Sequence, residues 1–125
     1  MPDAAQRFES RIRSLRERAD EDVAAFEAPD DTPATDEAMT YLRQGAGPAI
    51  SLYVEARTGG LMVHFPPEEY EALESAMNDW LELYAACYGY DIVAEFTVRE
   101  AAELLLDTEN IRDVAQVLTD VPERR

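Results

Sequence analysis

Lysine is absent from the sequence, so all eleven basic residues are arginine, and 27 acidic residues leave a formal net charge of −16. A large acid excess without lysine is expected of a protein that works in multimolar salt, where screening within a few ångströms suppresses self-repulsion. The alternative is a GC-rich genome, which favours arginine codons, combined with an acidic protein that binds basic partners. The charge balance therefore points first to a halophilic protein.

Cysteine and histidine occur only once each. A single thiol, Cys87, allows no disulfide within the chain, as expected in a reducing cytoplasm, and its place on an apolar helix face predicts a small core residue. His64 has no second histidine or cysteine at ligand spacing, so it is a weak indication of a metal. We therefore predict neither a metal site nor a cofactor.

Long apolar runs are also missing. No stretch approaches the roughly 20 residues of a membrane span, and the first residues lack the apolar core of a signal peptide, so we expect a soluble cytoplasmic protein with no membrane partner. Glycine-rich phosphate loops are absent, as is any Ser or Cys with a base at recognisable spacing. No pair of carboxylates stands out among 27 acids. We predict that the protein is not an enzyme and assign no catalytic residue.

What is present suits one globular domain, with 125 residues of which 46% are hydrophobic. The strongly acidic, lysine-free composition resembles that of small proteins from halophilic archaea, within an uncharacterised family of that group. The resemblance extends over the whole chain but concerns composition alone. It carries no motif and therefore implies no functional site.

The strongest pattern in the chain runs from Pro66 to Gly89 and predicts one long helix. Its apolar residues alternate spacings of three and four, which is typical of a helix that buries a seam. Methionine and aromatic residues are enriched at interface centres, so the seam is either a surface for a partner or a core covered by the C-terminal helices. The candidate interface residues are Tyr70, Leu73, Met77, Trp80, Leu81 and Tyr84.

Residues 3–28 predict a first helix with one apolar residue per turn, and five arginines crowd its first half. Such a cluster suggests contact with nucleic acid or with an acidic partner. The alternative is that it neutralises the protein's own acidic body or the same helix in a second copy. The candidate contact residues are Arg7, Arg11, Arg13, Arg16 and Arg18, together with Arg112 near the C-terminus.

Residues 50–65 alternate apolar and polar side chains on both sides of a Thr58-Gly59-Gly60 turn. A period of two is typical of a strand with one buried face, so this pattern predicts a β-hairpin. An isolated hairpin is marginal in water, and its apolar face should therefore pack on the long helix that follows. Residues 91–96 are β-prone and suggest a third strand.

Residues 97–119 predict two short helices, the first opened by a capping box from Thr97 to Glu100. The pair superficially resembles a helix-turn-helix, whose second helix enters the major groove of DNA. That helix offers two acids beside one arginine, a poor surface for phosphates, and the joint lacks the usual glycine. The other interpretation is a helical hairpin that covers one face of the domain.

Together these patterns predict an α+β fold that is mostly helical. A β-hairpin of two or three strands would pack on a long central helix, with an N-terminal arm helix and a C-terminal helical hairpin. The predicted boundaries are an amphipathic arm at 1–28, a proline-rich linker at 29–36, a single α+β domain at 37–121 and a tail at 122–125.

The function predicted first is a non-enzymatic protein-interaction module that forms a homodimer or binds another protein. The alternative is a DNA-binding transcription regulator that uses residues 97–119 or the arginine-rich helix. A small-molecule-binding domain, with the aromatic seam lining a pocket, comes third.

Overall fold

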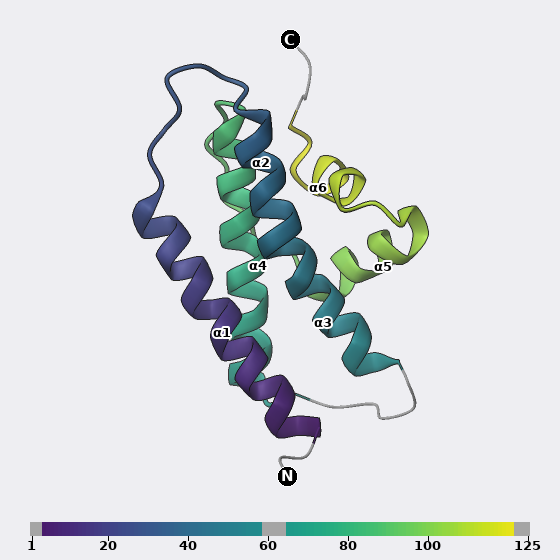
Figure 1. Ribbon diagram of the computed structural model, residues 1–125. Coiled ribbons are helices and arrows are strands. Elements are labelled where there is room, and N and C mark those ends of the chain that lie inside the picture. The colour runs from purple at the N-terminus through teal and green to yellow at the C-terminus, as the bar shows by residue number, and fades with distance from the viewer. Residues whose placement is uncertain (1–3, 59–64, 122–125) are drawn as a thin grey trace.

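The computed structural model describes residues 4–58 and 65–121, and every regular element in these ranges is helical (Figure 1). The helices α2, η1 and α3 follow one another without a break, η1 being a short π-helical segment. The elements in chain order are α1 (Ala4–Ala25), α2 (Thr35–Tyr41), η1 (Leu42–Ala46), α3 (Gly47–Arg57), α4 (Pro67–Cys87), α5 (Val98–Thr108) and α6 (Ile111–Thr119).

The predicted α+β fold is wrong, because the first strand of the expected hairpin is the helix α3 and the described residues contain no strand. The buried residues of α3 follow a helical spacing that the apparent alternation hid, and Tyr53, counted as polar in that alternation, is one of them. Pro48 also suits the first turn of a helix. The second expected strand falls mainly on residues 61–64, outside the described part. The buried residues of α3 are Ala49, Ile50, Leu52, Tyr53 and Ala56.

The predicted long helix corresponds to α4, which lies at the centre of the molecule with α1 and the α2–α3 run beside it (Figure 1). Its C-terminal end has the hydrogen bonds of a Schellman motif, in which Gly89 N–H binds the Ala86 carbonyl and Tyr90 N–H binds the Ala85 carbonyl. Gly89 has a φ of 88°, a conformation that favours glycine. The glycine that was expected to end the helix therefore does so.

The first helix is part of the core and not a separate arm. Phe8, Ile12, Leu15 and Ala19 occur once per turn and are all buried, and α1 packs extensively on α4. One apolar residue per turn is enough here because polar contacts to α4 add to the packing, as described below.

The π-helical segment η1 brings backbone into contact with the largest core side chain. A Cβ added at Gly45 would lie 2.3 Å from Cδ2 of Trp80, so only glycine leaves room for the indole ring. Three residues later, Pro48 has no N–H to donate to the Gln44 carbonyl, four residues before it. The Arg18 guanidinium from α1 donates to that carbonyl instead.

The two C-terminal helices pack on this body, α5 chiefly against α3 and α6 beside η1 and α4. The predicted capping box is present: Glu100 N–H donates to Thr97 Oγ1 at 3.1 Å, and Thr97 N–H donates to Glu100 Oε1 at 2.8 Å. Only Glu109, with a φ of 55°, and Asn110, which caps α6, separate the two helices.

Candidate interaction surfaces

The aromatic seam of α4 lies inside the monomer. Its central members are fully buried, and Tyr70 is half-buried with its ring edge-on to Tyr53 at 6.1 Å between centroids. Burial, with the nearby Glu74 carboxylate, raises the pKa of Tyr70 to about 12. Of the two interpretations of the seam, the structure favours an intradomain core. The seam residues with 0% exposure are Leu73, Met77, Trp80, Leu81 and Tyr84.

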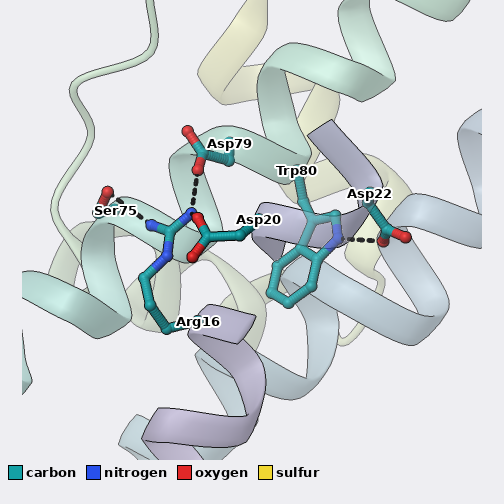
Figure 2. A network of polar contacts seen from close by, with 6 residues as sticks. All are labelled: Arg16, Asp20, Asp22, Ser75, Asp79 and Trp80. Atoms are coloured by element: carbon teal, nitrogen blue, oxygen red, sulfur yellow. Dashed lines mark hydrogen bonds and ion pairs between the residues drawn. The ribbon is translucent and has the colours of Figure 1, made fainter. Parts of the chain in front are cut away.

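Within the arginine cluster, Arg16 faces α4 and joins the two helices (Figure 2). Its guanidinium donates to Ser75 Oγ at 2.7 Å, to Asp20 at 2.6 Å and to Asp79. Burial alone would lower the pKa of Arg16, but the hydrogen bonds to Asp79 and Asp20 raise it overall. This arginine is therefore used within the fold.

A second polar contact between the same helices involves the buried indole. Trp80 Nε1–H donates to Asp22 Oδ2 at 2.8 Å, as Figure 2 shows. A buried indole N–H needs an acceptor, and the carboxylate on α1 supplies it. Each of the two helices therefore contributes a charged group to hold the other.

Most of the remaining arginines also contact groups of this chain. Arg11 pairs with Glu55 at 2.9 Å, and Arg13 pairs with Glu9 at 3.1 Å. The hydrogen bond from Arg11 lowers the pKa of the Glu55 carboxyl. Arg7 and Arg112 are exposed. The cluster is thus mainly engaged in neutralising the protein's own acids, which was one of its two interpretations.

The C-terminal hairpin presents few basic groups on its second helix. Glu109, Arg112 and Asp113 are exposed on α6 or at its start. Gln116 is not turned outward, because its amide donates to Tyr84 Oη at 3.1 Å and to the Val121 carbonyl at 2.6 Å. The residues left to meet DNA are two acids and one arginine.

The extended segment that follows the C-terminus of α4 runs back along this helix. The sequence patterns did not identify it as a functional element. Three backbone N–H groups of this segment donate to side chains of α4, at 2.9 Å from Ala94 to Glu82 and 3.0 Å from Val98 to Glu74. Between them, Phe96 N–H donates to Asn78 Oδ1 and the Asn78 amide donates back to the Phe96 carbonyl, both at 3.0 Å. Residues 91–97 have no β-strand pairing, so the third strand expected at 91–96 is absent, and Val98 already opens α5. For its extended course along α4 we call residues 91–98 the docked strand.

The geometry of this docking follows from two repeats. Side chains four apart on a helix are separated by about 6 Å along the axis, and residues two apart on an extended chain by about 6.6 Å. The side chains at positions 82, 78 and 74 can therefore accept hydrogen bonds from the backbone N–H groups of residues 94, 96 and 98, respectively. The segment runs antiparallel to the helix. Polar side chains of α4 replace the neighbouring strand of a sheet.

The exposure of the docked strand has the period of a β-strand. Even-numbered residues from Ile92 to Val98 are buried or half-buried, whereas odd-numbered residues from Asp91 to Thr97 are exposed. Val93 is the most exposed large apolar residue recorded in the described chain, at 83%. Within the described chain, the backbone N–H and C=O groups of Val93 and Glu95 make no hydrogen bond. The segment therefore has an unpaired outer edge.

Reactive chemistry is not apparent around these surfaces. Across residues 4–58 and 65–121, no three His, Cys, Asp or Glu side chains converge as metal ligands would, and His64 lies outside these ranges. Cys87 is buried, and that burial, with the Glu37 charge, raises the pKa of its thiol to about 11. No described helix has the length and apolarity needed to cross a membrane.

Comparison with known proteins identifies a family. The model of a domain of unknown function, DUF8055, matches residues 6–123. No curated protein matches the chain, and no solved structure matches it.

Proposed function

The chain belongs to the family of the domain of unknown function DUF8055, and we propose that it is a non-enzymatic protein-interaction module. The docked strand is its binding surface, and the partner contributes an extended segment that pairs with the outer edge of residues 91–97. The observation that carries this proposal is the unpaired backbone of Val93 and Glu95 beside an exposed Val93 side chain.

Exposed strand edges are places where another chain adds by main-chain hydrogen bonding. Here α4 holds the inner edge through Glu82, Asn78 and Glu74. Since the strand is ordered before a partner arrives, pairing does not have to pay the entropy of ordering it. The same contacts leave the outer edge accessible.

Charge selects the class of partner. Asp91 and Glu95 flank Val93 on the exposed side, and opposite charges across a strand pair stabilise it. The preferred segment therefore has two basic residues four positions apart and an apolar residue midway between them, so that all three face the same side of the strand pair. The net charge of −16 would also speed the approach of a basic partner at low salt.

A homodimer formed through this edge is less favourable. If two copies paired antiparallel about Val93, Asp91 of each would lie opposite Glu95 of the other. Like charges directly opposite are destabilising, so a different and basic chain fits the edge better than a second copy does.

The test uses a capped Arg-Thr-Val-Thr-Arg peptide with the full chain, at the lowest KCl concentration that keeps the protein folded. Binding should shift the amide resonances of Val93 and Glu95 and protect them from hydrogen exchange. Val93→Pro removes one edge N–H and should abolish this binding, whereas Val93→Thr retains the edge and should bind normally. Equal binding by the proline variant would contradict the proposal.

Light scattering tests whether a second copy of this chain, and not a different protein, pairs with the outer edge of the docked strand. We expect a monomer across protein concentrations. A dimer that Val93→Pro converts to monomer would assign the edge to self-association and overturn the basic-partner proposal, whereas a dimer unaffected by that variant would place self-association elsewhere.

The composition supports a cytoplasmic and halophilic setting for this module. One buried thiol suits a reducing compartment, and screening by multimolar salt reduces the repulsion among 27 acids. The midpoint of thermal unfolding should therefore rise steeply from low to molar KCl. A flat dependence would argue for an ordinary acidic protein.

A DNA-binding regulator is the second candidate, favoured by the two-residue joint between α5 and α6 with its left-handed Glu109. The exposed acids of α6 oppose it. Fluorescence anisotropy with mixed-sequence duplex DNA, at the lowest salt that keeps the fold, should show no saturable binding. Saturable binding that is lost in Arg112→Gln would favour this function instead.

A further inference from the structure

A groove between α1 and α3 combines apolar and cationic groups. Its volume is about 310 Å³, at the lower end of the range for small-molecule sites. Leu15 and Leu52 line it with Pro48, and α1 adds two serines and two arginines. The polar lining residues are Ser10, Arg11, Ser14 and Arg18.

The charge of this groove is opposite to that of the protein. Two arginines and no acid line it, although the chain as a whole has a net charge of −16. Arg11 and Arg18 are seven residues apart on α1, so they lie about two turns apart on one face, with Ser14 between them. An anion in the groove would therefore meet guanidinium groups at both ends and a hydroxyl donor in the middle.

Both arginines are held in place before any ligand binds. Arg18 donates to the Gln44 carbonyl that Pro48 cannot serve, and Arg11 pairs with Glu55 and lies 5.3 Å from the centroid of the Phe8 ring. A guanidinium has five N–H donors, so one contact leaves others for a ligand. Side chains held in this way lose less entropy on binding.

We infer that the α1–α3 groove binds a small organic anion, a carboxylate or sulfonate with an apolar body. The anionic group would accept hydrogen bonds from Arg11 and Ser14, and the apolar body would lie against the half-buried Pro48, over the largely buried Leu15 and Leu52. Charge complementarity favours the anion, and the apolar lining favours an organic ligand over a bare inorganic ion.

Octanoate is the first probe, titrated into the folded full-length protein and followed by amide and methyl resonances. It should shift Ser14, Leu15 and Leu52 in a saturable manner. Octyltrimethylammonium has the same body with the opposite charge, and sulfate has charge without a body, so both should bind at least tenfold more weakly. Equal binding of either probe would overturn the inference.

Two ion pairs, each of which uses an arginine of α1, provide the variants. Arg11→Gln removes a groove guanidinium and should weaken octanoate binding about tenfold. Glu55→Gln frees Arg11 from its carboxylate partner and should tighten binding about threefold. Arg13→Gln and Glu9→Gln make the same changes in the exposed pair outside this groove and should leave binding unchanged.

The direction of the Glu55 result is decisive, because a variant that merely damaged the fold would not tighten binding. Unchanged or weaker binding in Glu55→Gln would overturn the role of Arg11. A loss in Arg13→Gln equal to that in Arg11→Gln would move the anion out of the groove and overturn the inference as well. Val93→Pro, which tests the docked strand, should leave octanoate binding intact.

Discussion

The two sides of α4 are held by different kinds of contact. On one side, the apolar seam and Trp80 pack against α1, α2 and η1, with carboxylates closing the edges. On the other, Glu74, Asn78 and Glu82 bind the backbone of the docked strand. The first side depends on shape and the second on hydrogen-bond register. A polar helix face can therefore hold another segment of the chain in place through hydrogen bonds, without being part of the buried core.

Gly45→Ala tests the packed side and should have the largest effect. The new methyl group would lie within 2.5 Å of three indole atoms of Trp80, and overpacking of this kind costs about 3 kcal/mol or more. Urea denaturation should show a much lower midpoint or no folded protein.

Trp80→Ala provides the matched background for that prediction, because it removes the indole atoms that the methyl group would meet. The double variant should be less destabilised than the sum of the two single changes. Strict additivity would mean that Gly45 matters for its backbone conformation and not for its contact with the indole.

Asn78→Ala tests the docked side and should cost about 2 kcal/mol, since it removes two hydrogen bonds and leaves both backbone groups of Phe96 without protein partners. Hydrogen exchange should accelerate at Ala94 and Phe96 well before it does in the core of α4. Glu82→Gln is the control, because its amide oxygen can still accept from the Ala94 N–H. A uniform increase in exchange across all helices would contradict a locally docked strand.

Arg16→Gln tests the edge between α1 and α4 and should cost about 1 kcal/mol at low salt, since both partners are partly exposed and solvent screens them. The cost should shrink in molar KCl. Arg13→Gln breaks a more exposed pair on the same helix and should change the unfolding free energy by less than about 0.5 kcal/mol. Equal costs for the two variants would show that Arg16 does not hold the helices together.

The contrast between the two sides of α4 also explains which features could be predicted from the sequence. Periodic apolar residues predicted α4, and a local capping box at Thr97 predicted the start of α5, because both signals are contained in a few neighbouring residues. The α3 region was misread because Ile50, Leu52 and Val54 alternate like a strand, while packing against other helices decides which of its faces is buried. Local pattern could not separate these two outcomes.

The docked strand could not be predicted from local sequence patterns for a different reason. Its β-propensity was visible at residues 91–96, but a strand was expected to pair with another strand. Asn78 and Glu82 lie off the apolar seam of α4, and nothing in their own neighbourhood indicates a backbone partner 12 to 18 positions later. The only local sign is the four-residue spacing of Glu74, Asn78 and Glu82, which many exposed helices share.

Cys87 lies on the packed side of α4, and its contribution to stability changes only at alkaline pH. Burial and the Glu37 charge raise the pKa of its thiol from 9.0 to about 11, so the folded state disfavours the thiolate. The stability that this thiol contributes is fully present below pH 9 and is lost as the pH rises through about 11. The unfolding free energy of Cys87→Ala should lack that part of the alkaline decline, while the decline from Tyr70 remains.

The same thiol reports which side of α4 has opened. It lies seven residues after Trp80 on the packed seam, so its reaction with a disulfide reagent at pH 8 should be slow in the native protein and in Asn78→Ala. Any folded fraction of Gly45→Ala should react faster, because the packing around Trp80 continues along the seam to Cys87. Equal acceleration in both variants would mean that the two sides of α4 open together, and the distinction between packing and register would then not extend to the dynamics of the protein.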